Sequence, residues 1–389
     1  MCSAGGGHSV LLLSDGSAVA CGRNNDGQCD IPPLEEGMCY TQVSAGEYHS
    51  VLLRSDGSAV ACGRKHEGQC NLPPLEEGVC YTQVSSGAAH SVLLRSDGSA
   101  VACGMNDGQC DIPPLEEGVC YTQASAGTNH SLLLRSDGSA VACGLNDDGQ
   151  CDIPPLEEGV CYTQVSSGAA HSVLLRSDGS AVACGMNDDG QCNIPPLEEG
   201  MLYTQVSAGD EHSVLLRSDG SAVACGWNDY GQCNIPPLEE GMCYTQVSAG
   251  DYHSVLLRSD GSAVACGRND YGQCDIPPVA AAGCLYVFDV GRDYVLQAGV
   301  AFQDDTAVLT CWDLAGHEVL HLRAIDSDLA WDIYKRIAHD LQVSLQSLRL
   351  VLPNGQLLAS ICRAIPLATV ADLRFPGQVN LSEPGRRLT

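Results

Sequence analysis

Residues 49–63 read HSVLLRSDGSAVACG, and this stretch decides the fold of the chain. Two short apolar runs flank an Asp-Gly pair, which is the strongest short-range signal for a tight β-hairpin. The same unit carries the pair Pro73-Pro74, and a helix does not continue through such a pair because proline lacks the backbone donor. The unit is therefore predicted to consist of β-strands.

The hairpin belongs to a repeat whose Gly-x-x-His-Ser segment recurs every 40 or 41 residues. A period of this length is typical of propeller blades or helical arrays, and the hairpin pattern favours a propeller. Each unit offers four strands, namely YTQVSAG, HSVLLRS, SAVACG and a short one at GQCDI. We expect a mainly β protein with a seven-bladed β-propeller. The repeated histidines are His8, His49, His90, His130, His171, His212 and His253.

The two ends of the repeat predict how the ring closes. The first unit begins near Ser3, without most of its first strand, and the segment from Gly283 to Phe288 matches GMCYTQ in register. We expect the strand near residues 285–289 to complete the first blade. The chain is therefore divided into a propeller at 1–290, a linker or extra strand at 291–305 and a small domain at 306–389.

The last part of the chain follows a different pattern, which indicates a small α+β domain. Residues 306–313 and 318–324 alternate like the two strands of a hairpin. Apolar residues spaced four apart from Leu329 to Leu341 predict a helix, and LRLVL at 348–352 predicts a further strand. This order resembles the ubiquitin-like β-grasp. The chain ends in EPGRRLT without a terminal Gly-Gly, so conjugation to other proteins is not implied.

The charge balance argues against nucleic acid as a partner. The chain of 389 residues carries 48 acidic and 19 basic side chains, a net charge of −29, and such a chain is a poor ligand for a phosphate backbone. It contains no run of 18 apolar residues, and its first ten residues lack the basic start and the cleavage site of a secretory signal. We expect a soluble cytoplasmic protein without membrane contact, with the nucleus as the alternative compartment.

Nineteen of the 23 cysteines follow the repeat. Most units have one after Val-Ala, one after Gly-Gln and one before Tyr-Thr-Gln, where a single unit has Leu202 instead. A leucine at an equivalent position indicates an apolar site, and free cysteine packs as a small apolar side chain. We expect buried free thiols. Disulfides within a blade and a metal site are the alternatives, although the spacing lacks the close cysteine pairs of zinc sites.

The pattern G-x-x-H-S-x-x-L-x-S-D-G-x-x-x-x-x-G-x-N-x-x-G-Q resembles the chromosome-condensation-regulator (RCC-type) repeat, and the likeness covers residues 1 to about 290. It implies the propeller fold. It leaves the function open, since the family includes exchange factors for a small nuclear GTPase, propeller modules of HECT-type ubiquitin ligases, plant ultraviolet receptors and a bacterial β-lactamase inhibitor. The propeller has one tryptophan, Trp227, where the receptors need a cluster. Its constant units leave no room for the insertion that interrupts the ring of the exchange factors.

The repeated residues do not form a catalytic or metal-binding constellation. Seven equivalent histidines indicate a repeated hydrogen bond that holds a blade corner. Loops such as Asn146-Asp147-Asp148-Gly149 lack the spacing and the closing Glu of an EF-hand, so Asn and Asp are interpreted as turn formers. The His-Ser pair of each unit lacks a unique third member of a triad. We therefore expect a non-enzyme without a cofactor or a metal ion.

The differences between units locate a candidate binding surface. Along the chain, the Gly-x-x-His loops and the loops after Cys-Gly share one rim, whereas the Ser-Asp-Gly turns and PPLEEG loops share the other. Nearly all variation falls on the first rim, where blades six, seven, one and two supply Trp, Tyr and Arg, the residues that dominate interface hot spots. The predicted partner-binding residues are Arg23, Glu47, Tyr48, Arg64, Lys65, His66, Trp227, Tyr230, Asp251, Tyr252, Arg268 and Tyr271.

The sequence thus predicts a monomeric, non-catalytic scaffold that binds a partner protein on one rim of its propeller. Two alternatives stay open. A propeller with a ubiquitin-like domain resembles components of the ubiquitin-ligase pathway, in which the chain would recruit substrates or regulate the ligase. Guanine-nucleotide exchange on a small GTPase is the second alternative.

Overall fold

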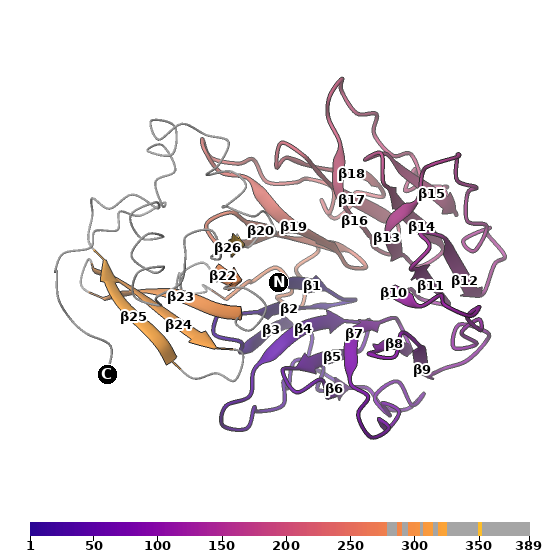
Figure 1. Ribbon diagram of the computed structural model, residues 1–389. Coiled ribbons are helices and arrows are strands. Elements are labelled where there is room, and N and C mark those ends of the chain that lie inside the picture. Colours follow the sequence, from indigo (N-terminus) through magenta and orange to yellow (C-terminus); the bar gives the residue numbers. More distant parts are fainter. Residues whose placement is uncertain (278–285, 290–294, 304–305, 314–317, 325–348, 352–389) are drawn as a thin grey trace. The chain divides into compact units, whose positions relative to one another are not determined.

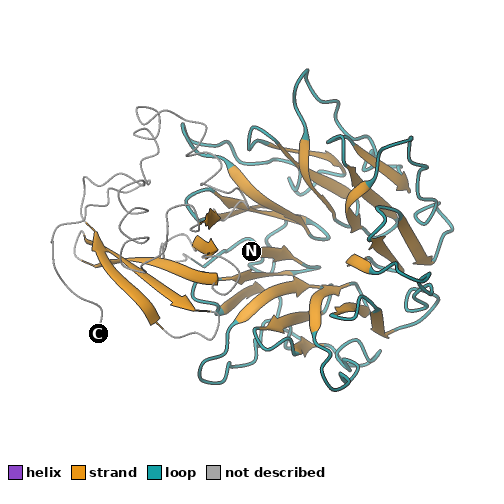
Figure 2. Cartoon of the chain, viewed as in Figure 1, coloured by secondary structure: helices purple, strands orange, loops and turns teal. Residues whose placement is uncertain are grey.

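The computed structural model describes residues 1–277, 286–289, 295–303, 306–313, 318–324 and 349–351. Contacts divide the chain into two compact units, Met1–Pro278 and Val279–Thr389. Within the described residues every regular element is a β-strand (Figure 2). The first unit is the predicted seven-bladed propeller, and its boundary lies at residue 278 rather than 290.

Seven antiparallel sheets of three strands form the blades, and Figure 1 shows them following one another around a ring in chain order. The predicted Asp-Gly hairpin joins the second and third strands of each blade, as in the pairing of His49 with Gly63 and of Leu53 with Ala59. Glycine is required at the turn because Gly57 has a φ of 79°. The strands are β1 (Cys2–Ala4), β2 (His8–Leu12), β3 (Ala18–Gly22), β4 (Tyr40–Ala45), β5 (His49–Arg54), β6 (Ala59–Gly63), β7 (Tyr81–Ser86), β8 (His90–Arg95), β9 (Ala100–Gly104), β10 (Tyr121–Ala126), β11 (His130–Arg135), β12 (Ala140–Gly144), β13 (Tyr162–Ser167), β14 (His171–Arg176), β15 (Ala181–Gly185), β16 (Tyr203–Ala208), β17 (His212–Arg217), β18 (Ala222–Gly226), β19 (Tyr244–Ala249), β20 (His253–Arg258) and β21 (Ala263–Gly267).

The predicted fourth strand at GQCDI is wrong, because this segment forms turns. In the first unit the side-chain Oε1 of Gln28 accepts a hydrogen bond from the amide of Asp26 at 3.0 Å. The Oδ1 of Asn24 accepts another from the amide of Cys29 at 2.8 Å. These contacts use the backbone donors locally, so they are not available to a fourth strand. The same two bonds recur in later units.

The predicted closure by residues 285–289 is also wrong. The chain's own first residues form β1, which pairs with β2 from Cys2 opposite Leu11 to Ala4 opposite Ser9. The strand β22 (Tyr286–Asp289) pairs instead with β23 (Val295–Gln303) and β26 (Arg349–Val351). Three residues of β1 complete the first blade because blade seven holds them through side chains.

Glutamine and serine side chains connect the innermost strands of neighbouring blades. Gln42 Oε1 accepts from the amide of Val84 at 2.9 Å, and its Nε2 donates to the carbonyl of the same residue at 3.2 Å. A primary amide can thus replace the backbone partner that a neighbouring strand would supply. At the closure, Gln246 makes both bonds to Cys2, and Ser248 Oγ accepts from the amide of Ala4 at 2.9 Å.

The apolar core lies between adjacent blades. Val92 and Leu94 of β8 pack against Tyr121 and Ala124 of β10 and Leu133 of β11, and all five are buried. The other blades repeat this arrangement, including the closing pair of blades seven and one. Because burial of one Val or Leu contributes about 1.5–3 kcal/mol, each blade depends on its neighbours for much of its stability.

The seven histidines connect the second strands of neighbouring blades. The Nε2 atom of each lies 2.8 or 2.9 Å from a serine Oγ in the following blade. The predicted hydrogen bond is therefore present seven times, but it joins two blades rather than holding a corner within one. The pairs are His8 with Ser50, His49 with Ser91, His90 with Ser131, His130 with Ser172, His171 with Ser213, His212 with Ser254 and His253 with Ser9.

The serine partner determines the tautomer of the imidazole. Ser50 Oγ donates its only proton to the backbone carbonyl of Gln28 at 2.8 Å, and the other six serines bond a glutamine carbonyl in the same way. The hydrogen between His8 and Ser50 must then come from Nε2 of the histidine. Among the described residues the Nδ1 atoms of all seven histidines are buried without a partner.

Burial lowers the pKa of these histidines from 6.5 to about 3 or about 4. At His8 and His212 the neighbouring histidines of the ring lower the pKa further. The ring is therefore neutral at physiological pH, because protonation would place a charge in a site without an acceptor for it.

The glycine that begins each Gly-x-x-His turn is required by the next blade. A Cβ atom on Gly46 would lie 2.3 Å from the carbonyl oxygen of Gly87 and 2.8 Å from Cε1 of His49. The first of these is backbone, which cannot move aside cheaply. The turn glycines therefore allow the close approach of neighbouring blades beside the histidine ring.

The second unit contains a sheet of five described strands in the order β25-β24-β23-β22-β26. The strands β24 (Thr306–Asp313) and β25 (Glu318–Ala324) pair antiparallel and coincide with the hairpin expected from the sequence. The segment 291–305, interpreted as a linker or extra strand, contains β23. The helix predicted between Leu329 and Leu341 lies outside the described residues.

The histidine ring makes stability depend steeply on pH. Because the folded pKa values lie below 6.5, the stabilisation is complete above pH 6.5 and is lost as the pH falls toward 4, where the unfolded chain binds up to seven more protons. Raised pKa values of Glu47, Asp210, Glu211 and Asp251 offset up to four of these seven protons. We expect the free energy of unfolding to fall by about 4 kcal/mol per pH unit in this range. Urea titrations at a series of pH values measure this slope, and a constant free energy from pH 7 to 4.5 would contradict it.

The closure by β1 predicts opposite effects for two truncations. A chain that ends at Pro278 keeps a complete first blade, and we expect its propeller to melt within about 2 °C of the full chain. Deletion of residues 1–4 exposes the edge of β2 and removes the partners of Gln246 and Ser248, so we expect a melting temperature lower by roughly 5 °C or more. Circular dichroism decides between the two, and the reverse order would support closure by residues 285–289.

Candidate partner-binding site

Two sets of loops lie together on one rim of the propeller. The Gly-x-x-His loops join the first and second strands of each blade, and the other set follows the third strands. One backbone hydrogen bond joins the two loops of a blade, as between the Arg64 amide and the Tyr48 carbonyl at 2.9 Å. The variable residues of both loops are therefore neighbours, as the path of the chain predicted.

Aromatic rings and guanidinium groups alternate along this rim, and we call this row the rim ladder. Arg268 Cζ lies 5.1 Å from the ring centroid of Tyr230 and 5.7 Å from that of Tyr271. Arg23 Cζ follows, 5.6 Å from Tyr271 and 5.1 Å from Tyr48, and Arg64 lies 5.2 Å from Tyr48 on the last step. Each cation–π contact contributes about 0.5–1 kcal/mol at an exposed site. The ladder consists of Trp227, Tyr230, Tyr252, Arg268, Tyr271, Arg23, Tyr48 and Arg64.

Three aromatic rings form the broad end of the ladder. The ring centroids of Trp227, Tyr230 and Tyr252 lie 5.1, 5.5 and 5.7 Å apart, and the planes meet at 72–82°. Edge-to-face packing of this kind stabilises each pair by about 0.5–1.5 kcal/mol beyond area burial. The rings are too close to enclose a cation between them, so they form a packed apolar surface on which Tyr230 is 44 % exposed.

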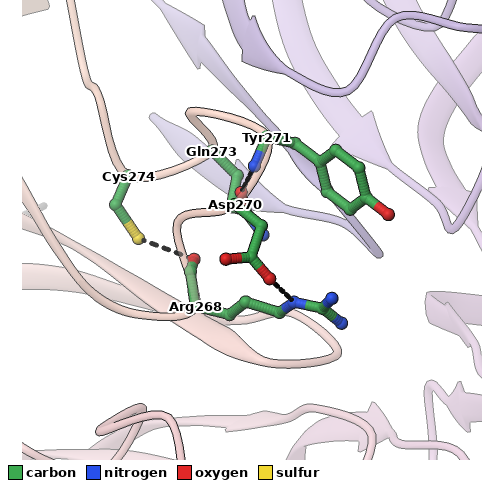
Figure 3. A network of polar contacts seen from close by, with 5 residues as sticks. All are labelled: Arg268, Asp270, Tyr271, Gln273 and Cys274. Atoms are coloured by element: carbon green, nitrogen blue, oxygen red, sulfur yellow. Dashed lines mark hydrogen bonds and ion pairs between the residues drawn. The ribbon is translucent and has the colours of Figure 1, made fainter.

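The loop that carries Arg268 is held by its own polar contacts (Figure 3). Arg268 Nε donates to Asp270 Oδ2 at 2.6 Å, and the amide of Tyr271 donates to Oε1 of the buried Gln273 at 3.0 Å. Cys274 Sγ donates to the carbonyl of Arg268 at 3.3 Å. The guanidinium group and the Tyr271 ring lie on the side away from Cys274. The ladder residues of this loop are thus held in place before any partner arrives.

One repeat position explains why the ladder occupies only part of the rim. The residue after Cys-Gly is an arginine or tryptophan in four neighbouring blades and an apolar aliphatic residue in the other three. Residues 1–278 contain ten basic side chains, and the six outside this rim stand at the equivalent ends of second strands. The remaining four therefore concentrate at one surface. The residues at this position are Arg23, Arg64, Met105, Leu145, Met186, Trp227 and Arg268.

Three carboxylates lie behind the ladder. A Cβ atom on Gly6 would lie 2.7 Å from Cγ of Glu47 and 2.8 Å from Oδ2 of Asp251, so both acids reach this glycine. Burial raises the pKa of Glu47, Asp210 and Asp251, and the other two acids raise that of Asp251 further. Tyr48 bonds Glu47, and Tyr252 bonds Asp210. Glu47 and Asp210 therefore support the tyrosines of the ladder, a role that the sequence analysis did not assign to either acid.

The remaining predicted residues lie outside the ladder. Lys65 and His66 are exposed in the loop after Arg64 and make none of the ladder contacts. Arg64 itself lies 3.9 Å from Glu67, a distance at which an exposed pair adds little stability. Of the twelve predicted residues the structure thus brings eight into one row, places two behind it and leaves two at its end.

The twenty described cysteines are all free, and only Cys2 and Cys62 are buried. The prediction of burial is wrong for most of these residues, and the prediction of free thiols stays a prediction. Leu202, which replaces one of them, is 46 % exposed, so that position lies near the surface. Cys62 Sγ donates to the Gln28 carbonyl at 3.5 Å. Burial is the main reason that the pKa of most thiols after Val-Ala and Gly-Gln rises to about 11 or about 12.

The described residues offer little to chemistry that needs a metal or a nucleophile. Among them, no three His, Cys, Asp or Glu side chains are arranged to hold a metal ion. Asn146 closes its acidic loop by bonding Asp152 and the amide of Cys151, which is the turn-forming role expected of it. In each His-Ser pair the serine proton is bound to a carbonyl and Nδ1 lacks the third member that a triad requires.

Comparisons with known proteins agree with this architecture. The family described as "Regulator of chromosome condensation (RCC1) repeat" matches residues 3–28, 40–69, 81–109, 121–150, 162–191, 203–232 and 244–273. No curated protein matches the chain. No helix long and apolar enough to cross a membrane occurs in the described part of the chain.

Several solved structures share the propeller. Prp20p from Saccharomyces cerevisiae, which binds Gsp1p and histones, is 21% identical with a TM-score of 0.57, over 69% of this chain and 82% of its own. Human WBSCR16 is 19% identical with a TM-score of 0.54, over 66% of this chain and 85% of its own. The ectodomain of the Arabidopsis thaliana receptor kinase ACR4 is 20% identical with a TM-score of 0.55, over 70% of this chain and 96% of its own. At these identities the likeness establishes the fold alone.

The state of the thiols can be tested by titration with a disulfide reagent. We expect the cysteines of the propeller to react completely when the chain is unfolded without reductant. In the folded chain those after Val-Ala and Gly-Gln should react at least about 100-fold more slowly, because raised pKa values reduce the thiolate fraction. If most of them fail to react in the unfolded chain, they are paired and the assignment of free thiols is wrong.

Proposed function

Because this chain belongs to the family of proteins built from regulator of chromosome condensation (RCC1) repeats, we propose that it is a non-catalytic scaffold whose rim ladder binds a partner protein. The observation that carries this proposal is the ladder itself. It gathers the one tryptophan of residues 1–278, and the four tyrosines of those residues that lie outside the repeated Tyr-Thr-Gln position, on one arc of a ring that is otherwise uniform.

The composition of the ladder suits a protein interface. Trp, Tyr and Arg are enriched at positions where truncation costs about 2 kcal/mol or more of binding free energy. Two of its tyrosines, Tyr230 and Tyr271, are 44 % and 45 % exposed, although an isolated propeller would gain stability by covering such rings. The supporting contacts hold the side chains in place, which reduces the entropy that binding would otherwise cost.

The opposite rim provides the contrast. Six units have the same PPLEEG loop with two exposed glutamates. The tyrosine that begins each of blades two to seven fastens these loops, as Tyr40 does by donating to the Pro32 carbonyl at 2.6 Å. A uniform acidic rim offers no single place for a specific partner, so this rim serves the framework in our proposal.

A role in ubiquitin ligation is the second candidate, and the residues that favour it are those of the C-terminal unit. The hairpin β24–β25 agrees with the first two strands of a β-grasp, and the predicted helix would follow it. In this proposal the propeller recruits a substrate while the second unit engages the ligation machinery. Binding of the isolated substrate to the propeller together with loss of its ubiquitination in cells on deletion of residues 279–389 would support it.

Nucleotide exchange is the third candidate and rests on the resemblance to the exchange factors of the family. Its test is the release of a labelled nucleotide from a small GTPase in the presence of the full chain. An unchanged release rate would remove this candidate and leave the scaffold function untouched.

The proposed scaffold function predicts which substitutions weaken partner binding. We expect the double variant Trp227→Ala with Arg268→Ala to bind a partner identified with the native chain at least tenfold more weakly, because it removes the broad end of the ladder. Met105→Ala changes the same repeat position on the other side of the ring, and Glu116→Gln with Glu117→Gln changes the opposite rim. Both should bind as the native chain does.

Calorimetric titration measures these affinities, and thermal unfolding confirms that each variant is folded. Loss of binding in the glutamate variant together with native affinity in the ladder variant would place the interface on the opposite rim and contradict the proposal.

A further inference from the structure

Arg23 differs from the other arginines of the rim ladder because it forms no ion pair among the described residues. Arg268 is paired with Asp270 at 2.6 Å, and Arg64 lies 3.9 Å from Glu67. Among the described residues the Arg23 side chain makes no ion pair or hydrogen bond, and its Nε atom, like that of Arg64, is buried without an acceptor. A buried donor without a partner destabilises the fold, and more so when the group is charged.

The two tyrosines beside Arg23 explain how it is held without an acid. Its Cζ lies 5.1 Å from the ring of Tyr48 and 5.6 Å from that of Tyr271. The rings contact the guanidinium group through π interactions that use none of its hydrogen-bond donors. The N–H groups of its two terminal nitrogens are thus available to an acceptor, and their planar arrangement matches the two oxygens of a carboxylate.

The acids of the chain near Arg23 are already engaged. Asp30 accepts from the side chain of Asn24 at 2.7 Å, and Glu47 is bonded to the hydroxyl of Tyr48. Arg23 lies near enough to Glu47 to lower the pKa of that carboxyl against the rise that burial causes, but among the described residues it forms no ion pair with either acid. The terminal nitrogens of Arg23 are therefore open to an acceptor on another molecule.

We propose that Arg23, between Tyr48 and Tyr271, receives the carboxylate of an Asp or Glu side chain on an exposed segment of the partner, with a large apolar residue of that segment on the Trp227 end of the ladder. This inference rests on the proposed function, in which the rim binds protein. It adds the chemistry of the partner. The segment carries one acidic residue and one aromatic or large aliphatic residue.

Two other occupants fit less well. A phosphate carries about two negative charges, and the three carboxylates behind the ladder together with a net charge of −29 oppose a dianion more than a monoanion. A second copy of the chain could present the glutamates of its PPLEEG rim, but two molecules of this net charge repel each other. A carboxylate on a different protein therefore meets less electrostatic repulsion than a phosphate or a second copy of the chain.

The test begins with a library of random linear peptides selected on the full chain. The variant Trp312→Phe with Trp331→Phe leaves Trp227 as the only tryptophan, so its fluorescence reports binding at the ladder. We expect peptides that shift this fluorescence to contain an Asp or Glu together with an aromatic or large aliphatic residue. One such peptide is then compared with versions in which the acid is replaced by its amide or by phosphoserine.

The expected result is at least a tenfold preference of the native site for the acid over the amide. Arg23→Gln should abolish this preference, and Met105→Ala, at the equivalent repeat position, should retain it. Arg23→Lys keeps the positive charge but loses the planar guanidinium group that can bond both carboxylate oxygens. It should therefore retain only part of the preference for the acid over the amide. Equal melting temperatures of these variants confirm that the fold is intact.

Each other outcome overturns a distinct claim. Peptides that bind the ladder without preferring acid over amide, or that keep the preference in Arg23→Gln, leave the proposed function intact and contradict the role of Arg23. If the phosphoserine peptide binds more tightly than the acidic peptide, the site prefers a phosphate, and the proposed carboxylate ligand is wrong. Selected peptides that leave Trp227 fluorescence unchanged and bind Trp227→Ala as tightly as the native site would contradict the proposed function as well.

Discussion

A buried histidine that donates to a serine of the next blade is the contact on which the propeller depends. Each blade has only three strands and shares its apolar core with its neighbours, so the relative position of two blades must be fixed by direct bonds. The His-Ser-Gln chain provides one such bond in every interface, including the closing interface between His253 and Ser9. The glutamine side chains of the innermost strands provide a second kind of direct bond, because they bond the backbone of a neighbouring blade. Because the residues that make these bonds recur in each unit, the framework can tolerate different residues in the loops that face away from it.

The rim ladder uses this freedom. Other blades have smaller, acidic or aliphatic residues at these positions, and the backbone bond that joins the two loops of a blade is present in all seven. The change from a plain rim to an arc of rings and guanidinium groups therefore requires few substitutions and no change of backbone. The tyrosines connect the arginines of the ladder to the carboxylates behind it. Their rings contact the arginines, and the hydroxyls of two of them bond the carboxylates.

The sequence predicted the blades and the arc because both follow from the repeat: the blades from what the units share, and the arc from where they differ. The period of the histidine, the Asp-Gly hairpin and the differences between units are visible without coordinates, and the grouping of Trp227, Arg268, Arg23 and Arg64 follows from closing the ring. The fourth strand was wrong because the amide groups of GQCDI are bound by side chains of Asn24 and Gln28, which a strand pattern does not reveal. The closure was wrong because three residues are enough for β1 when Gln246 and Ser248 supply the missing contacts. The partners of each arginine could not be predicted, since they depend on side-chain directions within loops of equal length.

Hydrogen–deuterium exchange of the full chain, with and without a bound partner, tests most directly the claim that the ladder is the binding face. The account predicts slower exchange in the loops around Tyr48, Arg64, Trp227, Tyr252 and Arg268 and in the loop after Arg23, with unchanged exchange in the PPLEEG loops. Protection confined to the PPLEEG loops, with the ladder loops exchanging as in the free protein, would contradict it.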